Sequence, residues 1–353
     1  MGKSIRTSDF GALEDGRHAT LYTLTNNRGI CLKLTDYGAA AVAMLVPDSY
    51  GAVQDVIWGF DSVSGYERTK YYLGATIGRF AGQINGGRFS LDGCTYGLTI
   101  NDHGNTLHGG VCGFDKRLFS GIVAETENKV AFSYYSPDGE GGFPGNLEVQ
   151  ATYTLTPQNE IIIQYQAVSD ADTVLNLTNH SYFNLDGHDS TSILKHTLSI
   201  HGEEYTDVAP DGSPNGRISS VADTPMDFRN PHEIGERIGE DFEQLRICGG
   251  YDHNWVIDRR GEGVRMCCEL AAEKSTRRLQ VLSNQPGLQM YSGNYLDGTE
   301  IGKNGVLYAY RSALCLEAQL YPNALNHPAF PSPILRRNEV YHNTIIYRFL
   351  GLG

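Results

Sequence analysis

The feature that most constrains how this chain can fold is a nine-residue alternation between apolar and polar residues. From Leu147 to Leu155 every second residue is apolar, and the residues between are Glu, Gln or Thr. A period of two places these two sets on opposite faces of a β-strand, one buried and one facing water. A Thr-Pro-Gln-Asn turn then leads into the apolar run that begins at Ile161. The two runs together predict an antiparallel meander.

Short runs of the same kind recur along the chain, separated by Gly, Asn, Asp or Pro, whereas helical periodicity is brief, as over 233–245. The predicted strands cover residues 18–25, 29–37, 40–46, 130–135, 147–155, 160–168, 198–200, 263–270, 278–283, 287–292 and 341–349. Two stretches rich in Gly and Asp, 82–113 and 202–231, are expected to be long loops. No low-complexity linker, charge block or repeat marks a boundary, so we expect residues 1–353 to form a single all-β domain with few short helices.

Charge and composition limit the kinds of partner that the protein is expected to bind. A net charge of −13 and a pI near 5.3 argue against nucleic acid, which requires a basic surface. The sequence has no apolar run of signal-peptide or membrane-spanning length, so we expect a cytoplasmic protein without a membrane partner. The seven cysteines are odd in number and lack a CxxC pair, which predicts reduced thiols and neither disulfides nor a zinc site.

A polar stripe within an otherwise strand-like segment is the strongest indication of a site. In the run from 174 to 183, the residues Asn176, Thr178, His180 and Tyr182 would share one face of a strand. A titratable, hydroxyl-rich face of this kind suggests a site of carbohydrate size. A single histidine, however, is more often a hydrogen-bonded structural residue than a catalyst.

Three further segments combine an ionisable side chain with glycine or turn residues, around His108, Asp252 and Glu317. A metal site built on His103 with His108, or on Asp252 with its neighbour His253, is not expected, because adjacent strand residues face opposite ways and no compact ligand set is present. A glycoside hydrolase using Asp252 and Glu317 stays open, since it needs the two carboxyl groups about 5–10 Å apart.

Taken in order, several motifs resemble those of the aldose 1-epimerase (galactose mutarotase) family over nearly the whole chain. They are Gly78-Arg79-Phe-Ala, His108-Gly-Gly, Asn179-His180-Ser-Tyr-Phe-Asn, Tyr251-Asp252-His253-Asn254, Gly287-Leu-Gln289-Met-Tyr and Leu316-Glu317-Ala-Gln319. The resemblance implies a large antiparallel β-supersandwich. Its cleft would bind a free monosaccharide and interconvert the α and β anomers without a cofactor or metal.

The resemblance also implies roles for individual residues. Glu317 would be the general base and His180 the general acid, with His108 near the ring oxygen. The expected substrate contacts are Asp252, Gln289, Gln83, Arg79 and Tyr182. Ring opening removes a proton from the anomeric hydroxyl and delivers one to the ring oxygen, which suits a carboxylate and a histidine. If the two groups face each other, each should support the other's charged state.

The chain departs from the family at one point. Where the family usually has Asn-Arg after Gly-Arg-x-Ala, this sequence has Gly82 and Gln83, so a cation expected in the sugar pocket is absent. Several readings therefore stay open: an epimerase acting on a pentose, a disaccharide or a hexose phosphate, or a sugar-binding protein without turnover. Either a monomer or a homodimer is compatible with the sequence.

Overall fold

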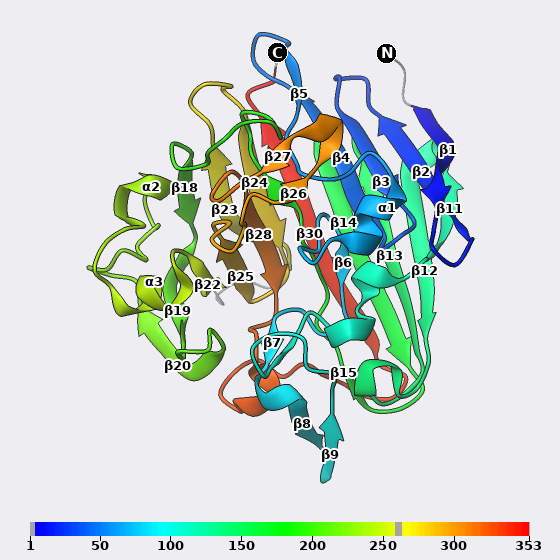
Figure 1. Ribbon diagram of the computed structural model, residues 1–353, viewed down its shortest axis with the longest axis vertical. Coiled ribbons are helices and arrows are strands. Elements are labelled where there is room, and N and C mark those ends of the chain that lie inside the picture. Colours follow the sequence, from blue (N-terminus) through cyan, green and yellow to red (C-terminus); the bar gives the residue numbers. More distant parts are fainter. Residues whose placement is uncertain (1–3, 258–262, 353) are drawn as a thin grey trace.

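The computed structural model describes residues 4–257 and 263–352, in which antiparallel sheets dominate (Figure 1). The largest sheet has nine strands and contains the predicted meander. In sheet order its strands are β11 (Ser120–Ala124), β12 (Lys129–Ser136), β13 (Leu147–Leu155), β14 (Glu160–Ser169), β30 (Val340–Leu350), β24 (Arg278–Ser283), β23 (Arg265–Ala271), β18 (Thr197–Ile200) and β21 (His232–Glu233). The prediction of an all-β fold is confirmed.

A five-stranded sheet from the N-terminal part of the chain lies in front of the green strands of the large sheet in Figure 1. It consists of β1 (Ser4–Ala12), β2 (His18–Thr25), β3 (Cys31–Thr35), β4 (Ala40–Pro47) and β5 (Val53–Asp55). Along β13 the exposure alternates as the sequence requires, and its apolar residues join one buried cluster with side chains of all three large sheets, among them Leu32, Tyr153 and Trp255.

A six-stranded sheet carries most of the residues discussed below. Its order is β17 (Tyr182–Phe183), β28 (Leu314–Gln319), β25 (Gly287–Tyr291), β22 (Asp252–Ile257), β19 (Gly202–Val208) and β20 (Pro214–Ser220). The stretch 202–231, predicted to be a loop, therefore supplies two strands. The two strands escaped the sequence analysis because β19 and β20 are rich in polar residues, and because β19 pairs on its other side with β22, about fifty residues further along the chain.

Short elements complete the fold. The helices are α1 (Val63–Arg68), α2 (Ile234–Arg237) and α3 (Glu243–Cys248). Five two-stranded ribbons pair β7 (Gln83–Ile84) with β10 (Thr106–Leu107), β8 (Arg88–Leu91) with β9 (Cys94–Gly97), β6 (Thr76–Ile77) with β16 (Thr178–Asn179), β15 (Thr173–Val174) with β29 (Ile334–Leu335), and β26 (Glu300–Ile301) with β27 (Leu307–Tyr308). The predicted loop 82–113 thus also contains short strands. Among the residues described, no helix has both the length and the apolar character needed to span a bilayer.

The segment predicted as one strand with a polar face is broken into three two-residue strands, β15, β16 and β17, each paired with a different partner. Asn176 and Thr178 do not face a ligand. The Asn176 amide donates to the carbonyls of Ala81 and Leu320, and the Thr178 hydroxyl donates to that of Ala318. These two side chains hold neighbouring segments together and leave His180 and Tyr182 to line the site.

Candidate active site

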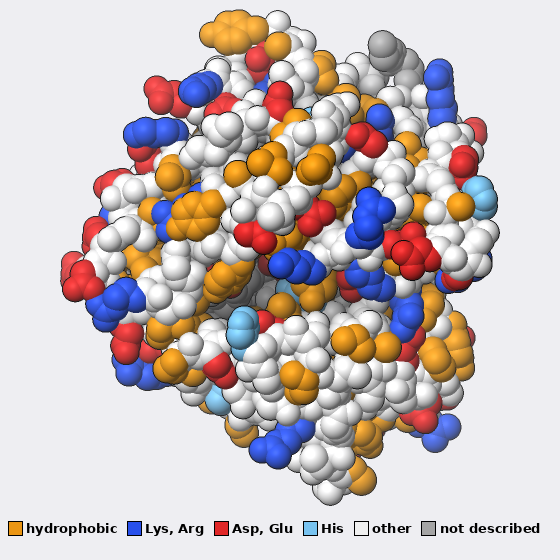
Figure 2. Space-filling model, viewed as in Figure 1, with side chains coloured by type: hydrophobic (Ala, Val, Ile, Leu, Met, Phe, Trp, Pro, Cys, Tyr) orange, Lys and Arg blue, Asp and Glu red, His pale blue; other side chains and the backbone are white. Residues whose placement is uncertain are grey.

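A cavity of about 910 Å³ opens on the face of the molecule shown in Figure 2, where the surface is hollowed and flanked by charged side chains and a histidine. Seven of the eight residues predicted for the site line it: Gln83, His108, His180, Tyr182, Asp252, Gln289 and Glu317. They come from positions more than 230 residues apart in the sequence, and the fold brings them together.

The register of the six-stranded sheet sets the floor of this cavity. Asn254, Gln289 and Glu317 are direct cross-strand partners on β22, β25 and β28. Direct partners share a face of the sheet, so all three side chains point into the cavity. The amide of Gln289 also donates to Oδ1 of Asp252 at 2.7 Å.

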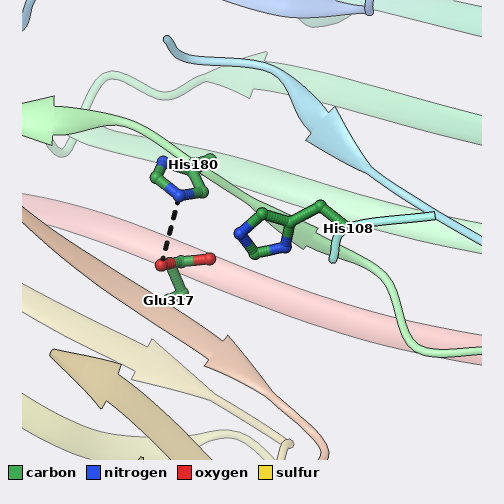
Figure 3. Close-up of side chains that lie close together, drawn as sticks. All are labelled: His108, His180 and Glu317. Atoms are coloured by element: carbon green, nitrogen blue, oxygen red, sulfur yellow. Dashed lines mark ion pairs between the residues drawn. The ribbon is translucent and has the colours of Figure 1, made fainter. Parts of the chain in front are cut away.

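His180 and Glu317 both line the cavity, and their side chains face each other (Figure 3). Nε2 of His180 lies 3.6 Å from Oε1 of Glu317, and the two side chains are only 6% and 3% exposed. The separation is longer than a hydrogen bond, so each group is free to bond an oxygen atom placed between or beside them. The second carboxylate oxygen of Glu317 is buried without a hydrogen-bond partner among the described residues.

Burial controls the protonation of this pair. It lowers the pKa of His180 to about 4, and burial together with the charge of Asp252 raises the pKa of Glu317 well above its usual value. The expectation that each group would stabilise the other's charge is therefore wrong, because the cost of withdrawing the two groups from water outweighs the attraction across 3.6 Å. When the pair holds one proton, these directions place it on Glu317 and leave the imidazole of His180 neutral.

Cys315 contacts the other nitrogen of His180, at 3.5 Å from Nδ1. Burial raises the pKa of Cys315 well above its usual value, so the sulfur stays a neutral thiol, which can accept a hydrogen bond from Nδ1–H. A proton held on Nδ1 in this way leaves Nε2, the nitrogen facing Glu317, as the atom that gives and takes the second proton. Cys315 had no role in the sequence analysis, since only its position on β28 beside Tyr182 reveals it.

His108 points towards the same pair (Figure 3). Its Nδ1 accepts a hydrogen bond from the backbone N–H of Gly82 at 3.1 Å, so the neutral ring carries its proton on Nε2. Burial and the neighbouring His180 lower the pKa of His108 well below its usual value. His108 is therefore a neutral hydrogen-bond donor, packed edge-on against Tyr72.

Comparison with known proteins agrees with this geometry. The sequence model described as aldose 1-epimerase matches residues 20–348. The chain belongs to the aldose 1-epimerase family. It is 40% identical over 346 residues to the galactose mutarotase of Homo sapiens, covering 98% of both chains, and 38% identical over 339 residues to the aldose 1-epimerase of Escherichia coli, covering 96% of this chain and 97% of that protein. A crystal structure of an aldose epimerase homologue from C. elegans superposes with a TM-score of 0.88 at 31% identity, over 95% of this chain and 100% of that one.

Arg79 does not belong to the site, although the aldose 1-epimerase motif suggested it. It is absent from the cavity lining and only 2% exposed. Its five N–H groups donate to the Ser136 hydroxyl and to the carbonyls of Ser136, Pro137, Pro144 and Gly145. A guanidinium has five N–H donors, so none is left for a substrate.

The departure from the family at positions 82 and 83 has a structural counterpart. A Cβ atom at Gly82 would lie 2.6 Å from Cβ of Pro322, and its φ of +81° favours glycine. The amide of Gln83 lies in the cavity and donates to Oδ2 of Asp102 at 3.1 Å. An aspartate thus takes part in the polar wall where the family usually has an arginine.

One group of described side chains could hold a metal ion: His108, His180 and Glu317, whose ligand atoms lie within 4.8 Å of one another. The group fits a metal poorly, because the N–H of Gly82 occupies Nδ1 of His108 and leaves the proton on Nε2. His103, which the sequence could have paired with His108, instead bonds Asp102, with its side chain 85% exposed.

Proposed function

We propose that this protein is an aldose 1-epimerase that interconverts the α and β anomers of a free aldose. The observation that carries the proposal is the pair formed by His180 and Glu317, buried and facing each other at 3.6 Å in a cavity large enough for a sugar. An imidazole and a carboxyl group in this arrangement can reach two oxygen atoms of one pyranose ring, the anomeric hydroxyl and the ring oxygen. The family relationship supports the same reaction.

Ring opening follows from the two groups. The carboxylate of Glu317 takes the proton of the anomeric hydroxyl while His180 gives a proton to the ring oxygen, the C1–O5 bond breaks and C1 becomes a carbonyl carbon. Rotation about C1–C2 and reversal of both transfers yield the other anomer. The neutral donor His108 would hydrogen-bond the ring-oxygen region, and Asp252 and Gln289 would hold hydroxyl groups.

The protonation states of His180 and Glu317 allow the pair to return to its starting form after each turnover. The charged pair consumed by ring opening and the neutral pair left after it carry the same number of protons. Burial favours the neutral pair, which is the form that accompanies the open-chain aldehyde. Conversion of one form into the other moves a proton between two groups 3.6 Å apart and needs no exchange with solvent.

The charges around the cavity favour a neutral sugar over a sugar phosphate. The lining contains six acidic residues (Glu67, Asp102, Asp115, Asp211, Asp252 and Glu317) and three basic ones (Arg68, Lys70 and Lys116). Lys116 is already occupied, because its ammonium group donates to the carbonyls of Tyr66, Glu67 and Thr69. We also propose a cytoplasmic location, which the free state of the cysteines supports.

The deciding experiment is anomer exchange by NMR on equilibrated D-galactose, D-glucose, L-arabinose, D-xylose and maltose. The parent protein should catalyse exchange of at least one sugar, and Glu317→Gln and His180→Asn should each lower kcat by roughly 10²–10⁴, the usual contribution of a general acid or base. Variants within about threefold of the parent would refute the assignment.

Two outcomes would point to other functions. Thermal stabilisation by a sugar without exchange would indicate a binding protein. Release of p-nitrophenol from a p-nitrophenyl glycoside, lost in Glu317→Gln, would instead indicate a glycosidase.

A further inference from the structure

Several buried polar atoms in the cavity have no hydrogen-bond partner among the described residues, and the proposed acid–base chemistry does not use them. They are the hydroxyl of Thr206 and both amide atoms of Asn254 and of Gln319. All three residues line the cavity and are at most 1% exposed. A buried polar atom without a partner costs about 1–3 kcal/mol, so five such atoms around one space indicate a group that enters from outside.

These three residues occupy one region of the six-stranded sheet. Gln319 lies two residues beyond Glu317 on β28, about 7 Å further along the strand and on the same face. Asn254 is on β22, and Thr206 is on the adjacent strand β19.

Gly287 on β25 makes the space that Asn254 occupies. It is the direct cross-strand partner of Gln319 on one side and of Val256 on the other. A Cβ atom at position 287 would lie 2.3 Å from Oδ1 of Asn254. The missing side chain therefore leaves room for the Asn254 amide beside Gln319.

The chemistry of this group selects its ligand. Two amides and a hydroxyl supply both donors and acceptors and carry no charge. A sugar hydroxyl also donates and accepts, so it can satisfy such a set, whereas a phosphate or carboxylate would require cations. The ligand that fits is the neutral, hydroxyl-bearing part of a sugar.

We propose that Thr206, Asn254 and Gln319 form a hydroxyl-binding subsite that holds the part of the substrate remote from C1 and sets which sugars bind well. The proposal rests on the function proposed above and deepens it, because it assigns specificity to residues that take no part in proton transfer. Sugars with free hydroxyl groups at that end are the preferred substrates, and sugars that lack one of these groups bind less well.

The test is a double-mutant cycle in which either a polar group of the protein or a hydroxyl group of the sugar is removed. Anomer exchange is measured with D-galactose, 4-deoxy-D-galactose, D-fucose (6-deoxy-D-galactose) and L-arabinose, on the parent and on Gln319→Leu, Asn254→Leu and Thr206→Val. We expect each variant to raise KM for D-galactose about three- to thirtyfold with kcat within twofold, because the lost contacts are equal in ground and transition states. For at least one analogue that lacks a hydroxyl, the variant and the parent should have the same KM, because the hydrogen bond between that hydroxyl and the replaced side chain is already absent.

Controls separate this result from loss of folding and from failure of the proposed function. Gln164→Leu, on an exposed position of β14, should leave all constants unchanged. Thr206→Val keeps the size of the side chain and remains informative if the leucine variants fail to fold. If the parent exchanges no anomers, the proposed function fails, and calorimetric affinities for the same sugars still test the subsite. The proposed subsite would be overturned by variants that weaken the binding of every sugar by the same factor, or that weaken the binding of no sugar by more than twofold.

Discussion

The thiol of Cys315 lies 3.5 Å from Nδ1 of His180 and two residues before Glu317 on the same strand. One short segment of β28 therefore carries the proposed base and also contacts the proposed acid from behind. The sulfur atom can accept a hydrogen bond from Nδ1–H both in the imidazolium and in the neutral imidazole that is left once Nε2 has given up its proton, so this contact persists through both halves of the reaction.

Replacing Cys315 should disturb the orientation of His180 more than sugar binding. We expect Cys315→Ala to lower kcat about three- to tenfold with little change in KM, whereas Cys315→Ser, which keeps a donor and an acceptor, should stay closer to the parent. Steady-state anomer exchange measures both constants. Cys268→Ala, which also removes a buried thiol but on β23, is the matched control. Equal losses in the Ala and Ser variants would contradict the role of the hydrogen bond.

The charge of Asp252 should set the pH dependence of the reaction. It helps to raise the pKa of Glu317, and burial raises the pKa of Asp252 itself to about 6. Catalysis needs the one proton that the pair of His180 and Glu317 shares, and the loss of that proton at high pH follows the raised pKa of Glu317. In Asp252→Asn that pKa decreases, and we expect the alkaline limb of the kcat/KM profile to move to lower pH. A limb that stays in place or moves to higher pH would refute the coupling.

Arg79 should matter for stability and not for sugar binding. Arg79→Lys removes at least two of five buried donors, so we expect the free energy of unfolding in urea to fall by about 2–4 kcal/mol. The KM of the folded fraction should be unchanged. The control is Arg17→Lys, at an exposed position. A raised KM with an unchanged free energy of unfolding would indicate that Arg79 contacts the substrate after all.

Gly82 should be intolerant of a side chain. We expect Gly82→Ala to destabilise the protein by about 2–4 kcal/mol, because the left-handed backbone costs about 1–2 kcal/mol and Pro322 adds a clash. Gly93→Ala isolates the first cost, since Gly93 has a φ of +82° with nothing within 4 Å. Urea unfolding measures both variants. Equal losses would show that the approach to Pro322 is unimportant.

Restoring the family's arginine should strengthen sugar binding. Gln83→Arg would form a charge-assisted pair with Asp102 and bring additional donors into the cavity. We expect KM for D-galactose to fall about two- to tenfold with kcat within twofold, because His180 and Glu317 are untouched. Gln83→Leu should have the opposite effect on KM. An arginine variant that binds galactose less well would show that the glutamine is adapted to another sugar.

Strand periodicity predicted much of the fold, because long strands of the large sheet such as β13 and β14 have one buried face. The strand Leu147–Leu155 has the predicted bounds, and the following one ends at Ser169, one residue beyond the prediction. The strands of 202–220 were missed, since their residues are largely polar and β19 pairs on one side with β22, about fifty residues further along the chain. The short strands within 173–183 depend on partners more than 100 residues away, which no local pattern encodes.

The sequence predicted the site residues that belong to recognisable motifs. It did not predict the residues whose roles depend on contacts with distant parts of the chain. His180 and Glu317 do lie together, but their pKa directions depend on burial, which the sequence does not specify. Cys315 and Gln319 acquire their roles only from neighbours on other strands. The five hydrogen bonds of Arg79 reach residues 57–66 positions further along the chain. The local motif around Arg79 therefore gave no sign that all five donors are used within the fold.

The row formed by Asn254, Gln289 and Glu317 ties chemistry to strand alignment. Side chains alternate between faces, so a slip of one residue between β25 and β28 would keep the backbone ladder paired and still turn Glu317 away from the cavity. Spectroscopic strand content would barely register such an error, whereas catalysis would disappear. Correct folding of this protein is therefore reported more faithfully by its turnover than by its secondary structure.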